Sequence, residues 1–254
     1  MIRDLARLVD AHAHAIALLS TAEERIGAFA VLVHPEPGLS AVTPHPDAPE
    51  DPGDVRPALD EIRARFAARG ESPRIELSML AWPGLPKAIE DAGFRLEEQA
   101  PLVVATPEWF SARPGPAQIA AVGPNDDAAF VAAVMRQGFE VRGAAEPEAE
   151  AQAVRRSLAA GVDIALARLD GAPAGSGCAS PRAGVAEIST LSVLPLLRRR
   201  GVGAQTVSFL AERCFARGAR LLWATPDGMP GMALASSLGF RDAGVRLAFV
   251  DATS

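Results

Sequence analysis

The stretch AEISTLSVLPLLRRRGVGA, residues 186–204, decides the fold of this 254-residue chain. Apolar and β-branched residues over 185–194 predict a buried strand, which Pro195 ends. A turn then brings Gly201 and Gly203 to the start of a helix. Backbone N–H groups at a helix N-terminus attract anions, and three consecutive arginines add positive charge. The stretch therefore predicts a cradle for a phosphate or pyrophosphate group.

Two common phosphate-binding motifs do not fit this stretch. It lacks the Gly-x-x-x-x-Gly-Lys-Ser/Thr of a P-loop and the Gly-x-Gly-x-x-Gly of a dinucleotide-binding fold. It resembles the Arg/Gln-x-x-Gly-x-Gly/Ala motif of the GNAT acetyltransferase superfamily, which Arg198, Gly201 and Gly203 fill. The Leu-Gly-Phe at 238–240 resembles that family's late signature. The resemblance covers residues 117–250 and implies the GNAT fold, an α/β (α+β) fold whose mixed central sheet is flanked by helices.

The resemblance also implies acetyl-CoA as the co-substrate. In the family, the backbone of the fourth strand pairs with the pantetheine arm, which maps to Leu191, Ser192 and Val193. The pyrophosphate loop maps to Arg198, Arg199, Arg200, Gly201, Val202, Gly203 and Ala204. We expect backbone N–H groups to make most of the contact and one or two arginines to add to it. The alternative for the arginines is a solvated run of charge.

Acetyl transfer to an amine needs a neutral nucleophile, which a general base can supply. Glu187 stands 11 residues before Arg198, the spacing at which the histone-acetylating branch of the family has its base glutamate. The alternative is an ordinary polar residue that faces out of the sheet. By the same resemblance, the backbone N–H of Leu191 would hold the oxyanion. Glu187 and Leu191 are thus the catalytic candidates.

The sequence departs from the family at the residue that protonates the leaving thiolate. Many members have a Tyr four residues before the Gly of Leu-Gly-Phe; here that position is Ala235, and the chain contains no Tyr. The Asn common seven residues earlier falls at Gly228. The neighbouring Ser236 and Ser237 are poor acids. Either the thiolate takes its proton from the amine or solvent, or the domain is a slow enzyme or binds its ligand without turnover.

Acceptor-binding residues are expected after the first helix of the second half. Family members often place them there, which points to Gln137, Phe139 and Glu140, and the Glu140 carboxylate suits a cationic amine. The alternative is an ordinary surface. No metal ion is expected, because the histidines all lie in the first half and His12 and His14, two residues apart, do not share a helix face.

Proline-rich residues 106–116 predict a boundary between two domains, 1–107 and 108–254. Residues 1–107 hold 10 basic and 17 acidic side chains, a charge of −7, whereas residues 108–254 hold 15 and 14, a charge of +1. A Gly-Phe after a short helix and an Arg-Gly before a strand recur in both halves at similar spacing, which favours duplication over chance. The acidic residues 46–54 replace the phosphate loop. We therefore expect a smaller, degenerate GNAT-like N-terminal domain.

Composition narrows the function classes. Hydrophobic residues make up 49% of the chain and charged residues 22%, which favours packed cores over disorder. Neither half has the basic excess of a nucleic-acid binder, and no apolar run predicts a membrane span or a signal peptide. The two distant cysteines, Cys178 and Cys214, fit a reducing, cytoplasmic location. The oligomeric state stays open between a monomer and a homodimer.

The sequence predicts an N-acetyltransferase that transfers an acetyl group from acetyl-CoA to a primary amine of a small molecule or peptide. The amine would attack directly in a ternary complex. The alternative is a CoA-binding sensor or another non-catalytic GNAT-like module. Among the expected elements are one strand over residues 26–33 and an exposed loop over residues 35–58.

Overall fold

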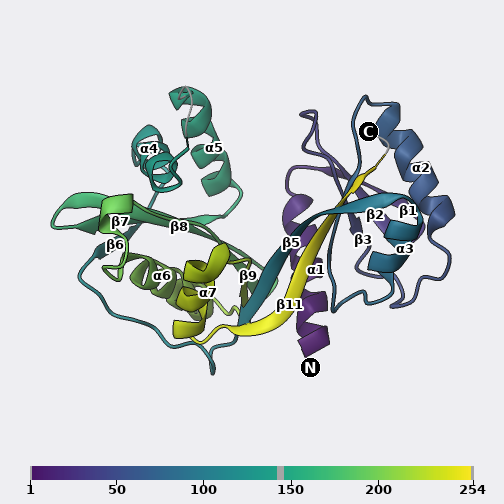
Figure 1. The fold of residues 1–254 in the computed structure, drawn as a ribbon. Coiled ribbons are helices and arrows are strands. Elements are labelled where there is room, and N and C mark those ends of the chain that lie inside the picture. The colour runs from purple at the N-terminus through teal and green to yellow at the C-terminus, as the bar shows by residue number, and fades with distance from the viewer. Residues whose placement is uncertain (1, 142–145, 253–254) are drawn as a thin grey trace. The chain divides into compact units, whose positions relative to one another are not determined.

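The computed structural model describes residues 2–141 and 146–252 and divides the chain into two compact units (Figure 1). Unit 1 consists of Met1–Val103, Thr225–Asp227 and Asp242–Ser254, and unit 2 of Val104–Ala224 and Gly228–Arg241. The first break lies near the predicted boundary at residue 107. The C-terminal strand, however, belongs to unit 1, whereas the predicted second domain includes it.

Unit 1 is a sheet whose strands follow the order β1-β2-β3-β4-β11-β5. Its elements are α1 (Ile2–Ala17), β1 (Ala22–Ile26), β2 (Phe29–Val33), β3 (Ala41–Pro44), α2 (Arg56–Ala67), β4 (Arg74–Ser78), α3 (Leu85–Asp91), β5 (Phe94–Ala105) and β11 (Arg241–Asp251). The strand β11, yellow in Figure 1, runs antiparallel to β4, from Arg246 opposite Ser78 to Val250 opposite Arg74. The C-terminal strand therefore lies between β4 and β5 in the sheet.

Large side chains fill the core of unit 1. Phe29, Phe66 and Trp82 are at most 2% exposed. The buried carboxylate of Asp10 in α1 accepts hydrogen bonds from the Ser78 N–H (3.0 Å), the Ser78 hydroxyl (2.6 Å) and the Trp82 indole N–H (2.9 Å). A buried carboxylate needs such donors, and these three tie α1 to β4 and the segment that follows it.

Two sequence predictions in unit 1 are confirmed only in part. The strand expected over 26–33 is confirmed as β2 from Phe29 on, but the chain turns at Gly27, whose φ of +58° suits a glycine, and Ile26 ends the preceding strand β1. The loop expected over 35–58 contains β3, which pairs with β2 and, at Val42 opposite Ile75, with β4. Prolines around β3 concealed this short strand.

Unit 2 contains the sheet strands in the order β6-β7-β8-β9-β10. Its elements are β6 (Gln118–Ala121), α4 (Ala128–Gly138), α5 (Pro147–Ala159), β7 (Asp163–Leu169), β8 (Ala172–Arg182), β9 (Val185–Val193), the 3₁₀ turn η1 (Pro195–Leu197), α6 (Val202–Ala216), β10 (Leu221–Ala224) and α7 (Gly228–Ser237). Tight turns at Asp170-Gly171 and Ala183-Gly184, all at positive φ, join β7 to β8 and β8 to β9. The predicted hairpin at Asp170-Gly171 is confirmed.

Helices cover both faces of this sheet. Figure 1 shows α4 and α5 on one side of β7–β9 and α6 and α7 on the other. Val131, Ile164 and Cys178 belong to the core under α4 and α5, and Ala167 and Val202 to a core under α6. The predicted α/β fold, a mixed sheet flanked by helices, is confirmed.

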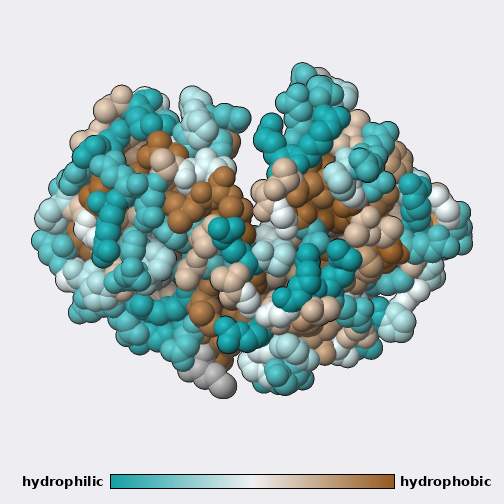
Figure 2. Space-filling model, turned by 180° about the vertical axis from the view of Figure 1, so that it is seen from behind, coloured by the Kyte–Doolittle hydropathy of each residue, from teal (hydrophilic) through white to brown (hydrophobic). Residues whose placement is uncertain are grey.

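In the view of Figure 2, hydrophilic residues cover much of each unit, and hydrophobic residues are visible in separate patches. Among the described residues, no helix is long and apolar enough to cross a membrane.

Candidate functional site at the end of strand β9

The strand β9 extends beyond its neighbour β10. The register of this parallel pair ends at Trp223 opposite Glu187, and β10 ends at Ala224. The edge of β9 from Ile188 to Val193 therefore continues past the end of β10. An unpaired strand edge presents N–H and C=O groups in a row, which suits an extended ligand that carries amides. The predicted residues Leu191, Ser192 and Val193 lie on this edge.

A β-bulge turns β9 at the same place. Ser176 lies opposite Ser192 but Cys178 lies opposite Ser189, so β9 has one residue more than β8 between these pairs. Thr190 within the bulge has a φ of +50°. On β8, a Cβ at Gly175 would overlap the carbonyl oxygen of Ser192, so β8 needs a glycine there.

The chain then enters α6 through an open, cationic turn. The N-cap of α6, Gly201, has a φ of +82° and provides no side-chain cap. The first N–H groups of a helix have no partner inside it, and the helix dipole favours an anion there. Arg199 and Arg200 are exposed, and no interaction joins their side chains to another described residue. These two arginines and the first N–H groups of α6 give the turn a positive charge.

Arg198 differs from the two arginines that follow it. Its Nε donates to the carbonyl oxygen of Val193 (3.2 Å), and its Nη2 donates to that of Gly138 (2.9 Å). Nη2 also lies 2.8 Å from the Glu140 carboxylate. The structure thus brings together Arg198, predicted for the cofactor, and Glu140, predicted for the acceptor. The other acceptor candidates, Gln137 and Phe139, are exposed near the end of α4.

Glu187 is half-buried at the last position where β9 still pairs with β10. It lies opposite Ser180 of β8. Its charge acts on Cys178: burial, with a contribution from Glu187, raises the pKa of the Cys178 thiol to about 11, although a hydrogen bond with Thr190 opposes the rise. Cys178 is therefore a neutral thiol at pH 7 and a poor nucleophile.

Position 235, where many members of the family have a tyrosine, holds a buried alanine in this chain. Ala235 in α7 is 7% exposed. Of the neighbouring serines, Ser237 donates its hydroxyl proton to the carbonyl oxygen of Leu234 (2.7 Å). Leu234 also packs near Gly203, where an added Cβ would lie 3.6 Å from its side chain. In this part of α7, small and apolar residues stand where the family has its acid.

Sequence reasoning missed two features that shape the site. The hydroxyls of Ser176 and Ser192 form a buried hydrogen bond of 3.0 Å. Gly138, at the end of α4, lies so close to β9 that an added Cβ would approach the Cβ of Ser192 to 2.6 Å. The glycines of Gly175-Ser-Gly177 were the available signal, because glycine inside a strand marks a bulge or a close approach.

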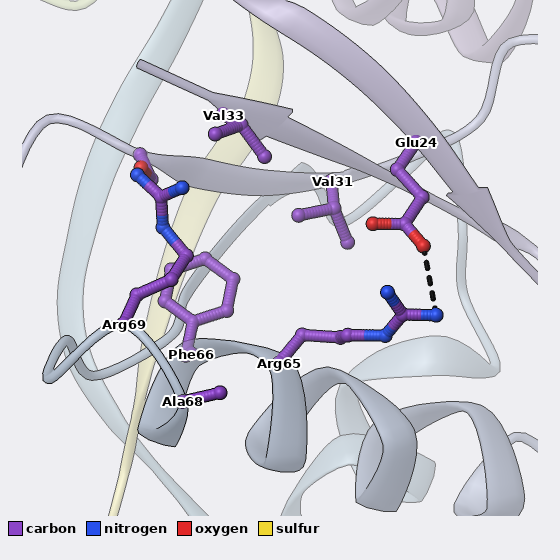
Figure 3. Close-up of a pocket in the computed structure, with 8 residues that line it drawn as sticks. Glu24, Val31, Val33, Arg65, Phe66, Ala68 and Arg69 are labelled. Atoms are coloured by element: carbon purple, nitrogen blue, oxygen red, sulfur yellow. Dashed lines mark ion pairs between the residues drawn. The ribbon is translucent and has the colours of Figure 1, made fainter. Parts of the chain in front are cut away.

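Unit 1 contains a separate pocket of about 270 Å³ (Figure 3). Val31, Val33 and Phe66 provide apolar walls, and Arg65 pairs with Glu24 at 3.0 Å. Arg69 donates to the carbonyl oxygen of His34 (3.2 Å) and pairs with Glu71. The charges around this pocket are already paired, so it offers no free cation to an anionic ligand.

Two of the histidines of unit 1, His14 and His45, form a small polar cluster with Glu23. His14 Nε2 and His45 Nε2 lie 3.6 Å and 3.3 Å from the same carboxylate oxygen of Glu23. Within residues 2–141 and 146–252, no group of three or more His, Cys, Asp or Glu side chains is arranged to hold a metal ion. The absence of a metal cofactor stays a prediction.

Comparison with known proteins relates this geometry to a family. Residues 129–240 match the model of the acetyltransferase (GNAT) family. None of the curated proteins matches the sequence.

Among solved structures, the chain is similar to a GCN5-related N-acetyltransferase from Kribbella flavida, with 23% identity and a TM-score of 0.80 over 97% of this chain and 95% of that one. It is similar to a tandem GNAT protein from the clavulanic acid biosynthesis pathway, with 16% identity and a TM-score of 0.67 over 89% and 78% of the two chains. It is also similar to a GCN5-related N-acetyltransferase from Sphaerobacter thermophilus, with 16% identity and a TM-score of 0.65 over 88% of this chain and 76% of that one. At these identities the similarity shows the fold alone.

Proposed function

Because residues 129–240 form a domain of the GNAT acetyltransferase family, we propose that the protein transfers an acetyl group from acetyl-CoA to a primary amine of a small molecule or peptide. One observation carries the proposal. The free edge of β9 leads directly to the uncapped N-terminus of α6, beside Arg199 and Arg200. This order of binding groups matches a ligand with an extended chain of amides followed by a pyrophosphate: the strand edge suits the amides, and the helix N-terminus suits the pyrophosphate.

The residues present fit acetyl-CoA. Backbone groups of Leu191, Ser192 and Val193 would pair with the pantetheine amides. The N–H groups of the turn at residues 198–204 would bind the pyrophosphate. Glycines at positions 201 and 203 keep side chains away from this turn: a Cβ at Gly201 would have Pro116 as its nearest neighbour, at 3.9 Å. Acetyl-CoA supplies an acetyl thioester, whose carbon–sulfur bond breaks as the amine nitrogen bonds to the carbonyl carbon.

Glu187 would act as the general base. An amine is protonated near neutral pH and attacks only after it loses a proton, which the Glu187 carboxylate accepts directly or through a water molecule. The backbone N–H of Leu191 would donate to the carbonyl oxygen as negative charge develops on it. The proton on Glu187 then returns to solvent, and the leaving thiolate takes a proton from solvent or from the amine, because Ala235 offers none.

The acceptor would bind on the side of the site where α4 ends. Phe139 is 48% exposed and provides an apolar surface, and Gln137 beside it offers an amide. The Glu140 carboxylate, predicted to hold the amine, already pairs with Arg198. A cationic acceptor would therefore share this carboxylate with Arg198.

Ala235 favours a second candidate function, a CoA-binding sensor without turnover. A general acid contributes to the rate but not to ligand binding. A domain that has lost it can still bind acetyl-CoA. The two functions differ in whether the thioester is consumed.

Two measurements test the proposal. Calorimetry with acetyl-CoA is expected to show one site in the micromolar range, and no binding at millimolar concentration would refute both functions. Release of free thiol is then followed with a panel of amino acids, peptides, polyamines and aminoglycosides. Amine-dependent thiol release supports the enzyme. Tight binding with no release from any amine supports the sensor.

A further inference from the structure

The end of α4 is held in an unusual conformation beside the site. The Glu140 N–H donates to the Gln137 carbonyl oxygen, and the Val141 N–H donates to that of Arg136, both at 3.2 Å. This is a Schellman cap, whose left-handed position is usually a glycine. Here the position is Glu140, with a φ of +54°. A non-glycine residue persists in this region only where its surroundings hold it there.

Arg198 provides that support. Its guanidinium bonds to three oxygens: those of Gly138 and Glu140, at the end of α4, and that of Val193, at the end of β9. Arginine presents several donors in a rigid fork, so one side chain can join two elements in a defined geometry. Gly138 and Arg198 are 60 residues apart in sequence, so this contact is a tertiary one.

Packing under this arginine is tight. An added Cβ at Gly138 would lie 2.6 Å from the Cβ and 2.7 Å from the hydroxyl oxygen of Ser192, so α4 ends almost in contact with β9. A small shift of α4 would therefore move the residues that follow it. The predicted acceptor residues Phe139 and Glu140 are those residues.

The charge of Arg198 is balanced by Glu140, whereas the side chains of Arg199 and Arg200 have no partner among the described residues. A neutralised guanidinium adds little attraction for a pyrophosphate, and an unpaired one adds more. The three consecutive arginines therefore differ in role.

We propose that Arg198 is a positioning residue for the acceptor, which locks the end of α4 to the end of β9, and that Arg199 and Arg200 are the side chains that bind the cofactor pyrophosphate. This inference rests on the proposed function for its substrates. It assigns to Arg198 a part in acceptor binding that its place in the cofactor motif does not indicate.

The test compares two substitutions that remove the same charge two residues apart. Arg200→Ala is expected to weaken acetyl-CoA binding by about tenfold and to reduce its salt dependence. Arg198→Ala is expected to change acetyl-CoA binding by less than threefold, to raise KM for the amine at least fivefold, and to speed hydrogen exchange of the amides of residues 136–141. If Arg198→Ala weakens acetyl-CoA binding as much as Arg200→Ala and leaves that exchange unchanged, the proposal is wrong.

Glu140 supplies a second test that leaves the arginines intact. Glu140→Gly keeps the left-handed cap and removes the carboxylate, and it is expected to raise KM for the amine with no loss of stability.

A conservative change of the arginine itself gives a further test. Arg198→Lys, which can reach fewer of the three oxygens, is expected to give an exchange rate between those of the native protein and Arg198→Ala. If neither variant moves the amine KM or the exchange rate, Arg198 does not act through α4. Absence of acetyl-CoA binding in the native protein would instead refute the proposed function, while the exchange result would still decide the role of Arg198.

Discussion

Each unit has a connection from a parallel strand to a helix, and the two connections carry opposite charge. β9 to α6 in unit 2 and β3 to α2 in unit 1 each link a strand, parallel to a neighbour, with a helix. In unit 2 the turn holds three arginines and leaves the helix N-terminus uncapped. In unit 1 the turn is acidic and uses its own carboxylates: Asp51 accepts from the Gly53 N–H (3.1 Å), and Asp54 accepts from the Arg56 N–H (3.0 Å).

The comparison indicates how the same strand–turn–helix arrangement can suit an anion in one unit and repel it in the other. In unit 1 two N–H groups of the turn before α2 already bond to aspartates, and the surrounding negative charge repels anions. We propose that unit 1 is a degenerate copy that no longer binds the cofactor. Four predictions test this contrast, and each pairs a change in unit 2 with a matched change in unit 1.

The largest effect is expected on catalysis. β9 carries Glu187, whereas β3 has no ionisable residue. Glu187→Gln is expected to lower kcat by roughly 10²–10⁴-fold and to abolish the rise in rate with pH that deprotonation of a base produces. The control is Glu76→Gln, a carboxylate on β4 that pairs with Arg74, which is expected to leave kcat unchanged. An unchanged pH–rate profile in the Glu187 variant would show that this residue is not the base.

The next effect is expected on acetyl-CoA affinity. Gly201→Val forces a β-branched residue to a φ of +82° at the start of α6. Such strain costs about 1–3 kcal/mol, or rearranges the turn, so affinity should fall about tenfold or more by calorimetry. Gly53→Val imposes similar strain at a φ of +69° in the acidic turn of unit 1. If the Gly53 variant loses affinity equally, the cofactor is not held by unit 2 alone.

The two units are also expected to differ in their response to pH. Burial raises the pKa of both thiols in unit 2, Cys178 and Cys214, to about 11. The folded state keeps these thiols protonated, so stability is full below pH 9 and falls as the pH rises toward 11, by roughly 2–3 kcal/mol per thiol. Urea unfolding at pH 7.5 and 10.5 measures the loss, which Cys214→Ala should reduce.

Unit 1 is expected to respond in the acid range. Burial lowers the pKa of His14 below its usual 6.5, although the nearby Glu23 carboxylate opposes part of the shift. The folded state favours neutral His14, so this contribution is present above pH 6.5 and is lost as the pH falls through the lowered pKa. Hydrogen exchange at pH 5 should show unit 1 opening more readily, and His14→Gln should remove the difference. Equal sensitivity of both units at both pH extremes would contradict this contrast.

The last difference is expected in stability, at two matching glycines that follow short helices, Gly239 in unit 2 and Gly93 in unit 1. Both have positive φ, but a Cβ at Gly239 would overlap the carbonyl oxygen of Trp109, whereas one at Gly93 would meet only the end of Arg63 at 3.3 Å. Both Ala variants incur about 1 kcal/mol of backbone strain, and Gly239→Ala adds about 1–3 kcal/mol of overlap. Thermal unfolding should therefore show the larger loss for Gly239→Ala; equal losses would mean that the Trp109 backbone yields freely.

Local patterns in the sequence were sufficient for most of the elements. The apolar run of β9 and the glycines before α6 have causes within a few residues, so they could be read directly. Short strands were harder, because Gly27 and the prolines around β3 interrupt the alternation that marks a strand. The place of β11 beside β4 depends on residues about 170 positions apart, and no local pattern encodes such a pairing.

The candidate site divided in the same way. The glycine motif predicted the helix N-terminus, and the family resemblance pointed to the strand edge at residues 191–193. The partners of Arg198 could not be predicted, because Gly138 and Glu140 approach it only through the packing of α4 on β9. The bulge at Thr190 was also missed, since it arises from how β8 and β9 pair.

The position of β11 also has a consequence for synthesis. On the ribosome, residues 1–103 emerge first, but their sheet lacks the strand between β4 and β5 until all of unit 2 has been made. Until then β4 and β5 expose strand edges, which are prone to pair with other chains. The nascent chain must therefore complete unit 1 last, and cutting the gene at the predicted boundary would leave both fragments with unpaired strands.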